Sequence, residues 1–416
     1  MPRKTKFARG IVLAAVVAAA VAACTPPLPP DVLAAQAENT IKCQTGDQSV
    51  SVPEDFAGVM APVSANLSGV CPDQTISEAA PGDPASLQVV DHAPTAEEMA
   101  AFQKTCPTGS VIVVPAFGYG VALAYNIIGL EGLILTPQVT AKILSGAITS
   151  WEDPAIAEAN PGVDLTGLPE IAVASVEAST GSVEAMTAWL AKEAPTDWTA
   201  GTVGTLETGT KFPTTADLLG ELTATEGTVA VLPIAEAVAN SVPVASVPVK
   251  DLIIAPDDGQ LQKVGLGATN ITKDDKGNML ASPAVGGVPV EGNYDLAASK
   301  IVLAEGQPVI GWPIIGVAHM MICDDPKDPL PLSTAQYVVR LAGQGGFESF
   351  GVIPLPEPIR IQTFTPLKVT IATDGATIAP SGGAAATSES VAPGGSVAPS
   401  ATVAPSASQE FAESSS

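Results

Sequence analysis

Residues Val111 to Leu190 decide the fold. This stretch opens with VIVVPAFGYGVALAYNI (111–127), continues with TPQVTAKILSGAITSWEDPAIAEANPG (136–162) and closes with IAVASVEASTGSVEAMTAWL (171–190). The first segment is a nearly continuous apolar run, which indicates buried strands over 111–128. The second is helix-like, and the third has the pattern of a strand, a Ser/Thr/Gly loop and a helix. Strands that alternate with helices in this way indicate an α/β fold.

Several helix boundaries carry capping signals. Thr136 suits an N-cap and Pro137 suits the first helical position, which predicts a helix over 136–145. Thr95 followed by Glu98 forms a capping box, which predicts a helix over 95–104. We also expect a strand over 171–174 and helices over 182–192 and 297–303.

Length and charge bound the class of protein. The chain has 416 residues, more than one hydrophobic core usually serves, so two lobes are expected. A formal net charge of −25 argues against nucleic acid as a partner, because phosphates need a basic surface. Buried backbone dipoles can still bind an anion locally. The chain's tryptophans are expected in the core at Trp151, Trp189 and Trp312.

The N-terminus has the pattern of an export signal over residues 1–23. Four basic residues precede an apolar run, Ile11 to Ala23, which is too short to span a membrane. The segment Val-Ala-Ala before Cys24 resembles the bacterial lipobox, whose Cys becomes the lipidated first residue. The alternative is an ordinary signal peptide with an incidental Cys. The resemblance implies an extracytoplasmic protein, anchored to the cell membrane by lipid at Cys24 and followed by a tether over 24–40.

Four further cysteines predict disulfides. An even number of Cys outside the cytoplasm favours bridges, and four allow three pairings. We favour Cys43–Cys71 and Cys106–Cys323, with free buried thiols as the alternative. The chain has two His and no CxxC spacing, so no metal site is expected, and no cofactor. Residues 374–416 are rich in Ala, Ser, Pro and Gly and are predicted to be disordered.

Four segments carry a family resemblance. AKILSGAITSWEDPAI (141–156), followed by NPG at 160–162, is the most specific, and TEGTVAVL (225–232), WPIIG (312–316) and GVIPLP (351–356) follow in the family's order. They resemble the extracytoplasmic phosphate-binding protein of bacterial phosphate ABC transporters. The resemblance covers roughly residues 85–360, and residues 40–85 match poorly.

The resemblance implies a type II periplasmic-binding-protein-like fold, with two α/β lobes, a hinge and an interlobe cleft. Lobe 1 would comprise residues 41–115 and, on its return, residues 241–373 with the C-terminal strands. Lobe 2 would comprise residues 116–240. In that family the anion is bound by helix N-terminal amides, hydroxyls, one Arg and one Asp, which suits the helix dipole.

Four residues match the family's ligand-binding positions. Asp91 falls where the phosphate-contacting Asp stands, and Thr180, Gly181 and Ser182 keep a hydroxyl–glycine–hydroxyl trio at a helix start. Helix capping, or for Asp91 solvation, is the alternative for these residues. Ser77 is a weak stand-in for the family's hydroxyl-bearing loop before the Asp.

Two positions depart from the family. Val176 stands where the family has its Arg, and Ala178 where it has Asp. Loss of such an Arg would cost several kcal/mol, on the order of a thousandfold in affinity. We therefore do not expect tight phosphate binding unless another cation, such as Lys142, Lys211 or Arg340, replaces the Arg.

Two functions remain open. The chain could be a lipid-anchored solute-binding protein that binds phosphate or a related small ligand for an ABC permease. Alternatively, it could be a degenerate binding-protein fold that acts as a surface sensor, scaffold or partner-binding module without transport. No enzyme is expected, because no acid/base pair or nucleophile has suitable spacing.

Overall fold

The computed structural model describes residues 38, 40–80, 83–106, 108–249, 251–256, 270–285, 292–295, 300–303, 311–369, 372–373 and 376–377. The predicted signal peptide (1–23), Cys24 and most of the tether lie outside these residues. So does the predicted disordered tail, apart from β17 (Ala376–Thr377), which pairs with β16 (Ala372–Thr373).

One nine-stranded sheet organises the described residues, in the order β2-β1-β3-β15-β4-β7-β5-β6 with β12 also paired to β15. Its strands are β1 (Gly46–Ser51), β2 (Gln74–Glu78), β3 (Leu87–Val90), β4 (Ser110–Tyr125), β5 (Ala172–Val176), β6 (Thr210–Phe212), β7 (Thr228–Pro233), β12 (Ala284–Val285) and β15 (Ile314–Asp324).

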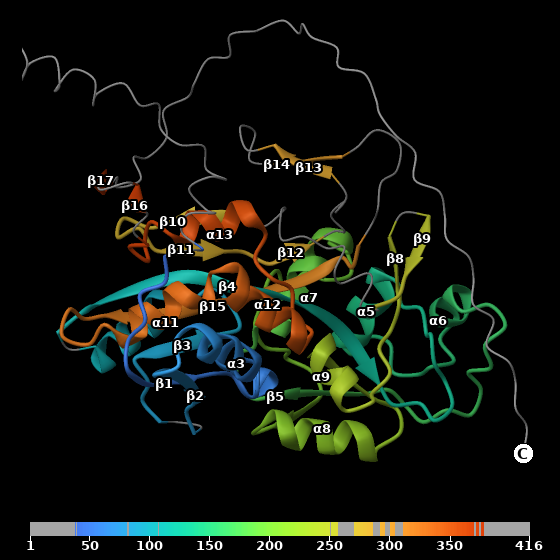
Figure 1. Ribbon diagram of the computed structural model, residues 1–416. Coiled ribbons are helices and arrows are strands. Elements are labelled where there is room, and N and C mark those ends of the chain that lie inside the picture. Colours follow the sequence, from blue (N-terminus) through green and yellow to red (C-terminus); the bar gives the residue numbers. More distant parts are fainter. Residues whose placement is uncertain are drawn as a thin grey trace, which may run out of the picture. The chain divides into compact units, whose positions relative to one another are not determined.

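Strand β4 connects two halves of this sheet (Figure 1). Residues 110–120 pair with β15, and residues 121–125 pair with β7, both antiparallel. The first half therefore contains β1, β2, β3, β12 and β15, and the second contains β5, β6 and β7. The apolar run predicted as several strands is one strand of 16 residues, buried from Ile112 to Tyr125. Burial on both faces explains why the run lacks apolar–polar alternation.

Helices cover both halves. They are α3 (Met60–Val70), α4 (Ala96–Phe102), α5 (Pro137–Leu144), α6 (Pro154–Ala159), α7 (Gly181–Glu193), α8 (Thr215–Ala224), α9 (Ile234–Ala239), α11 (Leu330–Val338), α12 (Leu341–Phe350) and α13 (Glu357–Thr363). Helices α3 and α11 pack on strands of the first half, and α8 and α9 pack on those of the second (Figure 1). Helix α7 packs against both β15 and β7, so it lies where the two halves meet.

The predicted caps form as expected. The Thr95 and Glu98 side chains make the full capping box at the start of α4. Thr136 caps α5, with Pro137 at its first position, and accepts a hydrogen bond from Val139 N. These local contacts fix the helix starts because they satisfy amides that have no partner within the helix.

The helix predicted over 297–303 is wrong where the structure describes it. Lys300–Leu303 form strand β14, which pairs antiparallel with β13 (Gly292–Asp295). Its central Ile301-Val302 pair is β-branched, which favours a strand when a partner is available. Two further hairpins are β8 (Val247–Val249) with β9 (Leu252–Ile254), and β10 (Ile271–Lys273) with β11 (Met279–Ala281).

The core tryptophans and the cysteine bridges agree with the predictions made from the sequence. Trp151, Trp189 and Trp312 are buried in the main apolar cluster, as predicted. The structure contains the two favoured disulfides, Cys43–Cys71 and Cys106–Cys323. The second bridge joins the segment before β4 to the end of β15, and it closes a loop of 217 residues.

Candidate functional site

Asp91 meets the N-terminus of α7. Asp91 directly follows β3, and its Oδ2 accepts a hydrogen bond of 2.6 Å from the Gly181 amide, 90 residues further along the chain. The Tyr119 hydroxyl donates to the Asp91 carbonyl oxygen at 2.6 Å. The structure therefore brings together the Asp and the Thr-Gly-Ser loop that the sequence singled out.

The start of α7 is built for close approach. Thr180 is the N-cap and accepts a hydrogen bond from Val183 N. A Cβ on Gly181 would lie 2.0 Å from the Asp91 carbonyl oxygen and 2.4 Å from the Tyr119 hydroxyl, so only glycine fits there. The Ser182 hydroxyl is buried and has no hydrogen-bond partner among the residues that the structure describes, although it lies near enough to Tyr119 to act on the pKa of that phenol in the lowering direction. Burial nevertheless holds the Tyr119 pKa well above its ordinary value.

His92 supplies the positive charge beside Asp91. Its Nδ1 lies 2.7 Å from Asp91 Oδ1, and its Nε2 lies 2.9 Å from Glu98 Oε1. The hydrogen bond to Asp91 raises the pKa of His92 to about 9, so the imidazole is protonated at neutral pH. Burial raises the pKa of Glu98, but hydrogen bonds from Thr95 and the nearby His92 outweigh it and lower that pKa. The capping box of α4 therefore also orients the charge partner of Asp91.

A second carboxylate contact joins the two halves of the sheet. Glu54 and Asp55 belong to the 3-10 helix η1 (Glu54–Phe56). Glu54 Oε2 accepts from the Thr215 amide at 2.9 Å, and Asp55 Oδ1 accepts from the Thr215 hydroxyl at 2.5 Å, at the start of α8. Burial raises the pKa of Asp55 to about 6, against the lowering effect of the Thr215 bond. Carboxylates that follow β1 and β3 of the first half thus accept hydrogen bonds from the N-termini of α8 and α7.

The surroundings of Asp91 are mostly acidic. Burial raises the pKa of Glu184 in α7, and the charges of Asp91 and Glu98 raise it further, while His92 opposes them. Asp55 lies close enough to Asp91 for their charges to interact. Such a field favours ligands that carry protons or little negative charge.

The three cations proposed from sequence as replacements for the family's Arg each contact other groups. Lys142 pairs with Asp197, Lys211 donates to Ser175 Oγ, and Arg340 donates to the Thr40 carbonyl. Val176 is half-buried and packs in the apolar cluster of the second half, and Ala178 is exposed. Ser77 lies on β2 and donates to Asp47. His92, which was not predicted as a site residue, is the residue that meets Asp91, and the available signal for it was its place directly after that Asp.

None of the helices formed by the described residues is long and apolar enough to cross a membrane. Within the same part of the chain, no three His, Cys, Asp or Glu residues gather in a way that could hold a metal ion.

The mixed sheet with its long shared strand and covering helices has the type II binding-protein fold. The sequence of the chain is similar to phosphate-binding proteins of the PstS type, from which it has diverged widely. It is 35% identical over 109 residues to the phosphate-binding protein PstS 3 of Mycobacterium leprae, covering 24% of this chain and 29% of the relative. It is 25% identical over 242 residues to the phosphate-binding protein PstS 2 of Mycobacterium tuberculosis, covering 57% and 60%.

The chain spans less than two thirds of the length of these curated relatives. No protein-family model matches it. Among solved structures, the fold is similar to a high-affinity periplasmic phosphate-binding protein, PfluDING, bound with phosphate. The TM-score is 0.51 at 17% identity, over 77% of this chain and 93% of the other. This likeness supports the fold.

Proposed function

We propose that the chain is a lipid-anchored, extracytoplasmic solute-binding protein that binds phosphate or a related small ligand and delivers it to an ABC permease. Its relatives are phosphate-binding proteins, and a similar structure is periplasmic. The signal peptide would be removed before Cys24, which would carry the lipid. Lobe 1 would comprise residues 41–115 and 241–373, and lobe 2 residues 116–240, with β4 passing between them. Replacement of Cys24 by Ser should move the protein from the membrane fraction to the soluble fraction.

The convergence of Asp91 with the first turn of α7 carries this proposal. Helix α7 has 13 residues, and its N-terminal amides present a partial positive charge toward Asp91. The Thr180 cap, the Gly181 amide and the unpartnered Ser182 hydroxyl would surround a ligand that entered between the two halves. A protonated phosphate could donate to Asp91, whereas a fully ionised anion would be repelled.

Calorimetry with phosphate, sulfate and small neutral ligands tests the proposal. Binding of phosphate, or of one of the others, that Ser182→Ala weakens about two- to tenfold would support it, since one neutral hydrogen bond is lost. Ser68→Ala, in α3 away from the site, is the matched control and should leave the affinity unchanged. No heat and no thermal shift with any of these ligands would contradict the proposal.

One observation favours the second function, a surface sensor, scaffold or partner-binding module that does not transport. The Gly181 amide, which a bound anion would use, already donates to Asp91. Val176 also replaces the family's Arg, so the site's own carboxylate is neutralised by His92 instead. An anion would have to displace Asp91 into an acidic environment.

Two measurements separate these functions. If the non-transport function is right, a defined envelope partner should be captured by wild type and by Val176→Asp with equal strength, while phosphate binds neither. Micromolar phosphate binding by the wild type would exclude this second function. Gain of phosphate binding in Val176→Arg, absent in wild type, would instead show that the fold kept its ligand site and lost only the cation.

A further inference from the structure

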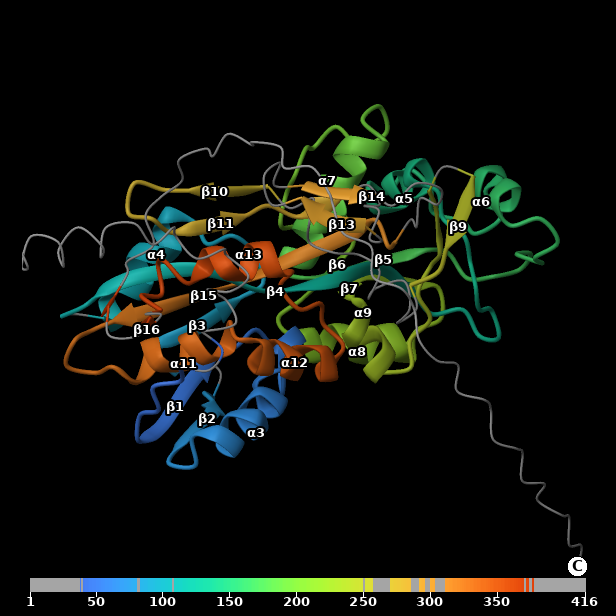
Figure 2. The same cartoon turned by 45° about the horizontal axis from the view of Figure 1, so that its top comes forward.

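A cavity of about 980 Å³ has none of the residues of the Asp91 site in its lining. Its walls are α4, the first residues of β4, the β10–β11 hairpin and the segment after α13 (Figure 2). Val90 pairs with His319 of β15, and the cavity residue Asp324 stands five residues further along that strand. At the rise of an extended strand, this separation is about 17 Å. This wall of the cavity is therefore remote from Asp91, whereas the α4 wall carries Glu98, which contacts His92. We call the cavity the hairpin pocket.

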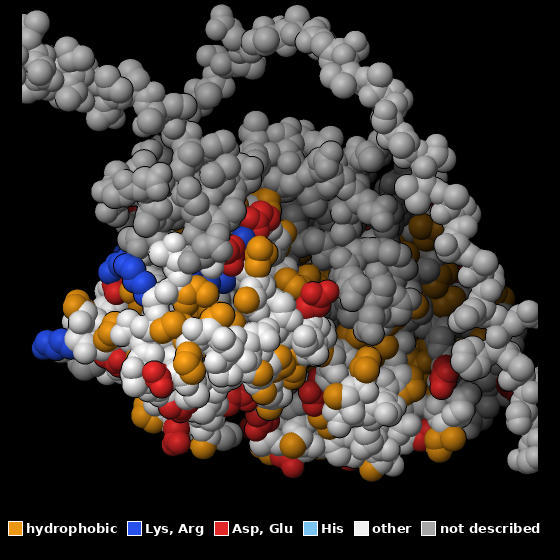
Figure 3. Space-filling model, viewed as in Figure 1, with side chains coloured by type: hydrophobic (Ala, Val, Ile, Leu, Met, Phe, Trp, Pro, Cys, Tyr) orange, Lys and Arg blue, Asp and Glu red, His pale blue; other side chains and the backbone are white. Residues whose placement is uncertain are grey.

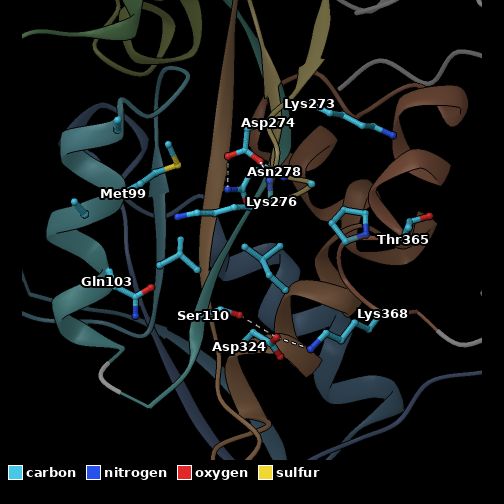
Figure 4. A pocket seen from close by; sticks show the side chains of 16 residues that line it. Met99, Gln103, Ser110, Lys273, Asp274, Lys276, Asn278, Asp324, Thr365 and Lys368 are labelled. Atoms are coloured by element: carbon cyan, nitrogen blue, oxygen red, sulfur yellow. Dashed lines mark hydrogen bonds and ion pairs between the residues drawn. The ribbon is translucent and has the colours of Figure 1, made fainter. Parts of the chain in front are cut away.

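Lys273, Lys276 and Lys368 line the hairpin pocket together with Asp274 and Asp324, so its lining carries one positive charge in excess. Lys368 pairs with Asp324. Asp274 is used inside the hairpin, where its carboxylate accepts hydrogen bonds from Lys276 N, Asn278 N and Asn278 Nδ2. Neither Lys273 nor Lys276 forms an ion pair with any residue that the structure describes, although Lys276 lies close enough to Asp274 for their charges to interact. Lys276 is the one considered further. Figure 4 shows its side chain reaching across the pocket toward Met99.

Positive charge is scarce in this chain, with 18 Lys and Arg against 43 Asp and Glu. Figure 3 shows the same contrast on one face, where Asp and Glu are spread across the view and the few Lys and Arg lie in its left half. An excess of positive charge in a concave site of such a chain is a local attraction for an anion. The Lys276 side chain is exposed to solvent where it lines the cavity, so screening limits this attraction to the scale of a surface charge pair.

The hairpin that carries Lys276 is fixed in place. Asn278 is 4% exposed, and its Oδ1 accepts a hydrogen bond of 2.9 Å from Val113 N on β4. Met279, next in the chain, is fully buried, and Gly277 supplies the positive φ of 85° that the turn requires. The Cys106–Cys323 bridge joins the end of the α4 segment to β15 on another side of the pocket. The pocket walls are therefore tied together by covalent and buried contacts.

The wall opposite Lys276 is apolar. Met99 and Val111 are half-buried beside the pocket, and Ala96, Ala100 and Pro366 add further apolar surface. Ligand pockets of this volume are usually mostly apolar with a few placed polar groups. We propose that the hairpin pocket binds a small organic carboxylate, with its carboxylate at Lys276 and its apolar body against Met99 and Val111.

Octanoate and its uncharged analogue octanamide test this proposal. Methionine-methyl NMR follows the ligand, because Met99 lines the pocket whereas the methionines of the described core are buried. Octanoate should shift the Met99 signal, and Lys276→Gln should weaken its binding about fivefold, the scale of one partly exposed charge pair. Octanamide should bind wild type and Lys276→Gln equally.

Lys104→Gln is the matched control, because Lys104 is exposed near the pocket but does not line it. It should leave octanoate binding unchanged, as should Asp91→Asn at the other site. Inorganic phosphate should not displace octanoate. No Met99 shift with millimolar octanoate, equal binding of octanoate and octanamide, or an unchanged affinity in Lys276→Gln would each overturn the proposal, whatever the outcome of the phosphate titrations.

Discussion

Replacement of Gly181 by Ala tests whether the Asp91–α7 contact holds the two halves of the sheet together. The added Cβ would lie 2.0 Å from the Asp91 carbonyl oxygen, whereas real Cβ contacts essentially never fall below 3.0 Å. Either the end of β3 or the start of α7 must therefore move by about 1 Å. The neighbouring atom is backbone, so the clash cannot be relieved by a side-chain rotation.

The expected cost combines three terms. Overpacking costs about 1–3 kcal/mol. Loss of the charge-assisted bond from the Gly181 amide to Asp91 costs about 1.5–3 kcal/mol. Alanine has a better helix propensity than glycine, which offsets about 0.5–1 kcal/mol of this loss of stability. We expect Gly181→Ala to lower the free energy of unfolding by about 2–5 kcal/mol, measured by denaturation in guanidinium chloride.

Gly220→Ala is the matched control. Gly220 lies inside α8, and nothing stands within 4 Å of the Cβ it would gain. The same substitution should there raise the free energy of unfolding by about 0.5–1 kcal/mol. The opposite signs separate the clash at Gly181 from a general effect of Gly-to-Ala replacement.

The imidazole of His92 gives a second readout by NMR, since the chain has only two His. Displacement of Asp91 should bring the pKa of His92 down from about 9 toward its ordinary value. Burial keeps the pKa of His319 at about 3, so the two titrations do not overlap. A Gly181→Ala protein as stable as wild type, with an unchanged His92 titration, would refute the geometry described for this contact.

Three further outcomes are expected. His92 has a raised pKa, so its stabilising contribution is complete below about pH 6.5 and is lost as the pH rises through about 9. His92→Gln should remove about 1–2 kcal/mol of that pH dependence, allowing for partial exposure. If urea unfolding gave the same change of unfolding free energy with pH for both proteins, this expectation would be contradicted. Asp55 is an acid with a raised pKa, so its contribution to stability is present below about pH 3.8 and is lost as the pH rises through about 6. Asp55→Asn should therefore be at least as stable as wild type at pH 7, and its unfolding free energy should change less between pH 4 and 6. A marked loss of stability of Asp55→Asn at pH 7 would oppose this expectation. Cys323→Ser should lower the free energy of unfolding by about 2 kcal/mol more than Cys71→Ser does. The reason is that the Cys106–Cys323 bridge closes a loop of 217 residues and the Cys43–Cys71 bridge one of 28. Equal thermal unfolding midpoints of the two variants would count against that order.

The sequence by itself determined the local features of this protein. Thr95 with Glu98, and Thr136 with Pro137, predicted two helix starts because capping depends on residues within one turn of each other. The alternation of strands and helices gave the α/β class, and the order of its motifs gave the resemblance. The pairing of Cys106 with Cys323 was favoured among three possibilities, and the structure contains it.

Only the tertiary structure decided which distant residues meet. Lys300–Leu303 form a strand because β13 pairs with them, and the β-branched Ile301-Val302 pair favours that strand only when such a partner is present. The charge partner of Asp91 is its neighbour His92, yet that pairing depends on α4 bringing Glu98 to the other side of the ring. Asp91 and Gly181 stand 90 residues apart, and their contact depends on how the halves that β4 joins pack around α7. A helix cap depends on residues that are neighbours in the sequence, so it can be predicted locally. The contact of Asp91 with the N-terminus of α7 depends instead on the packing of the whole sheet.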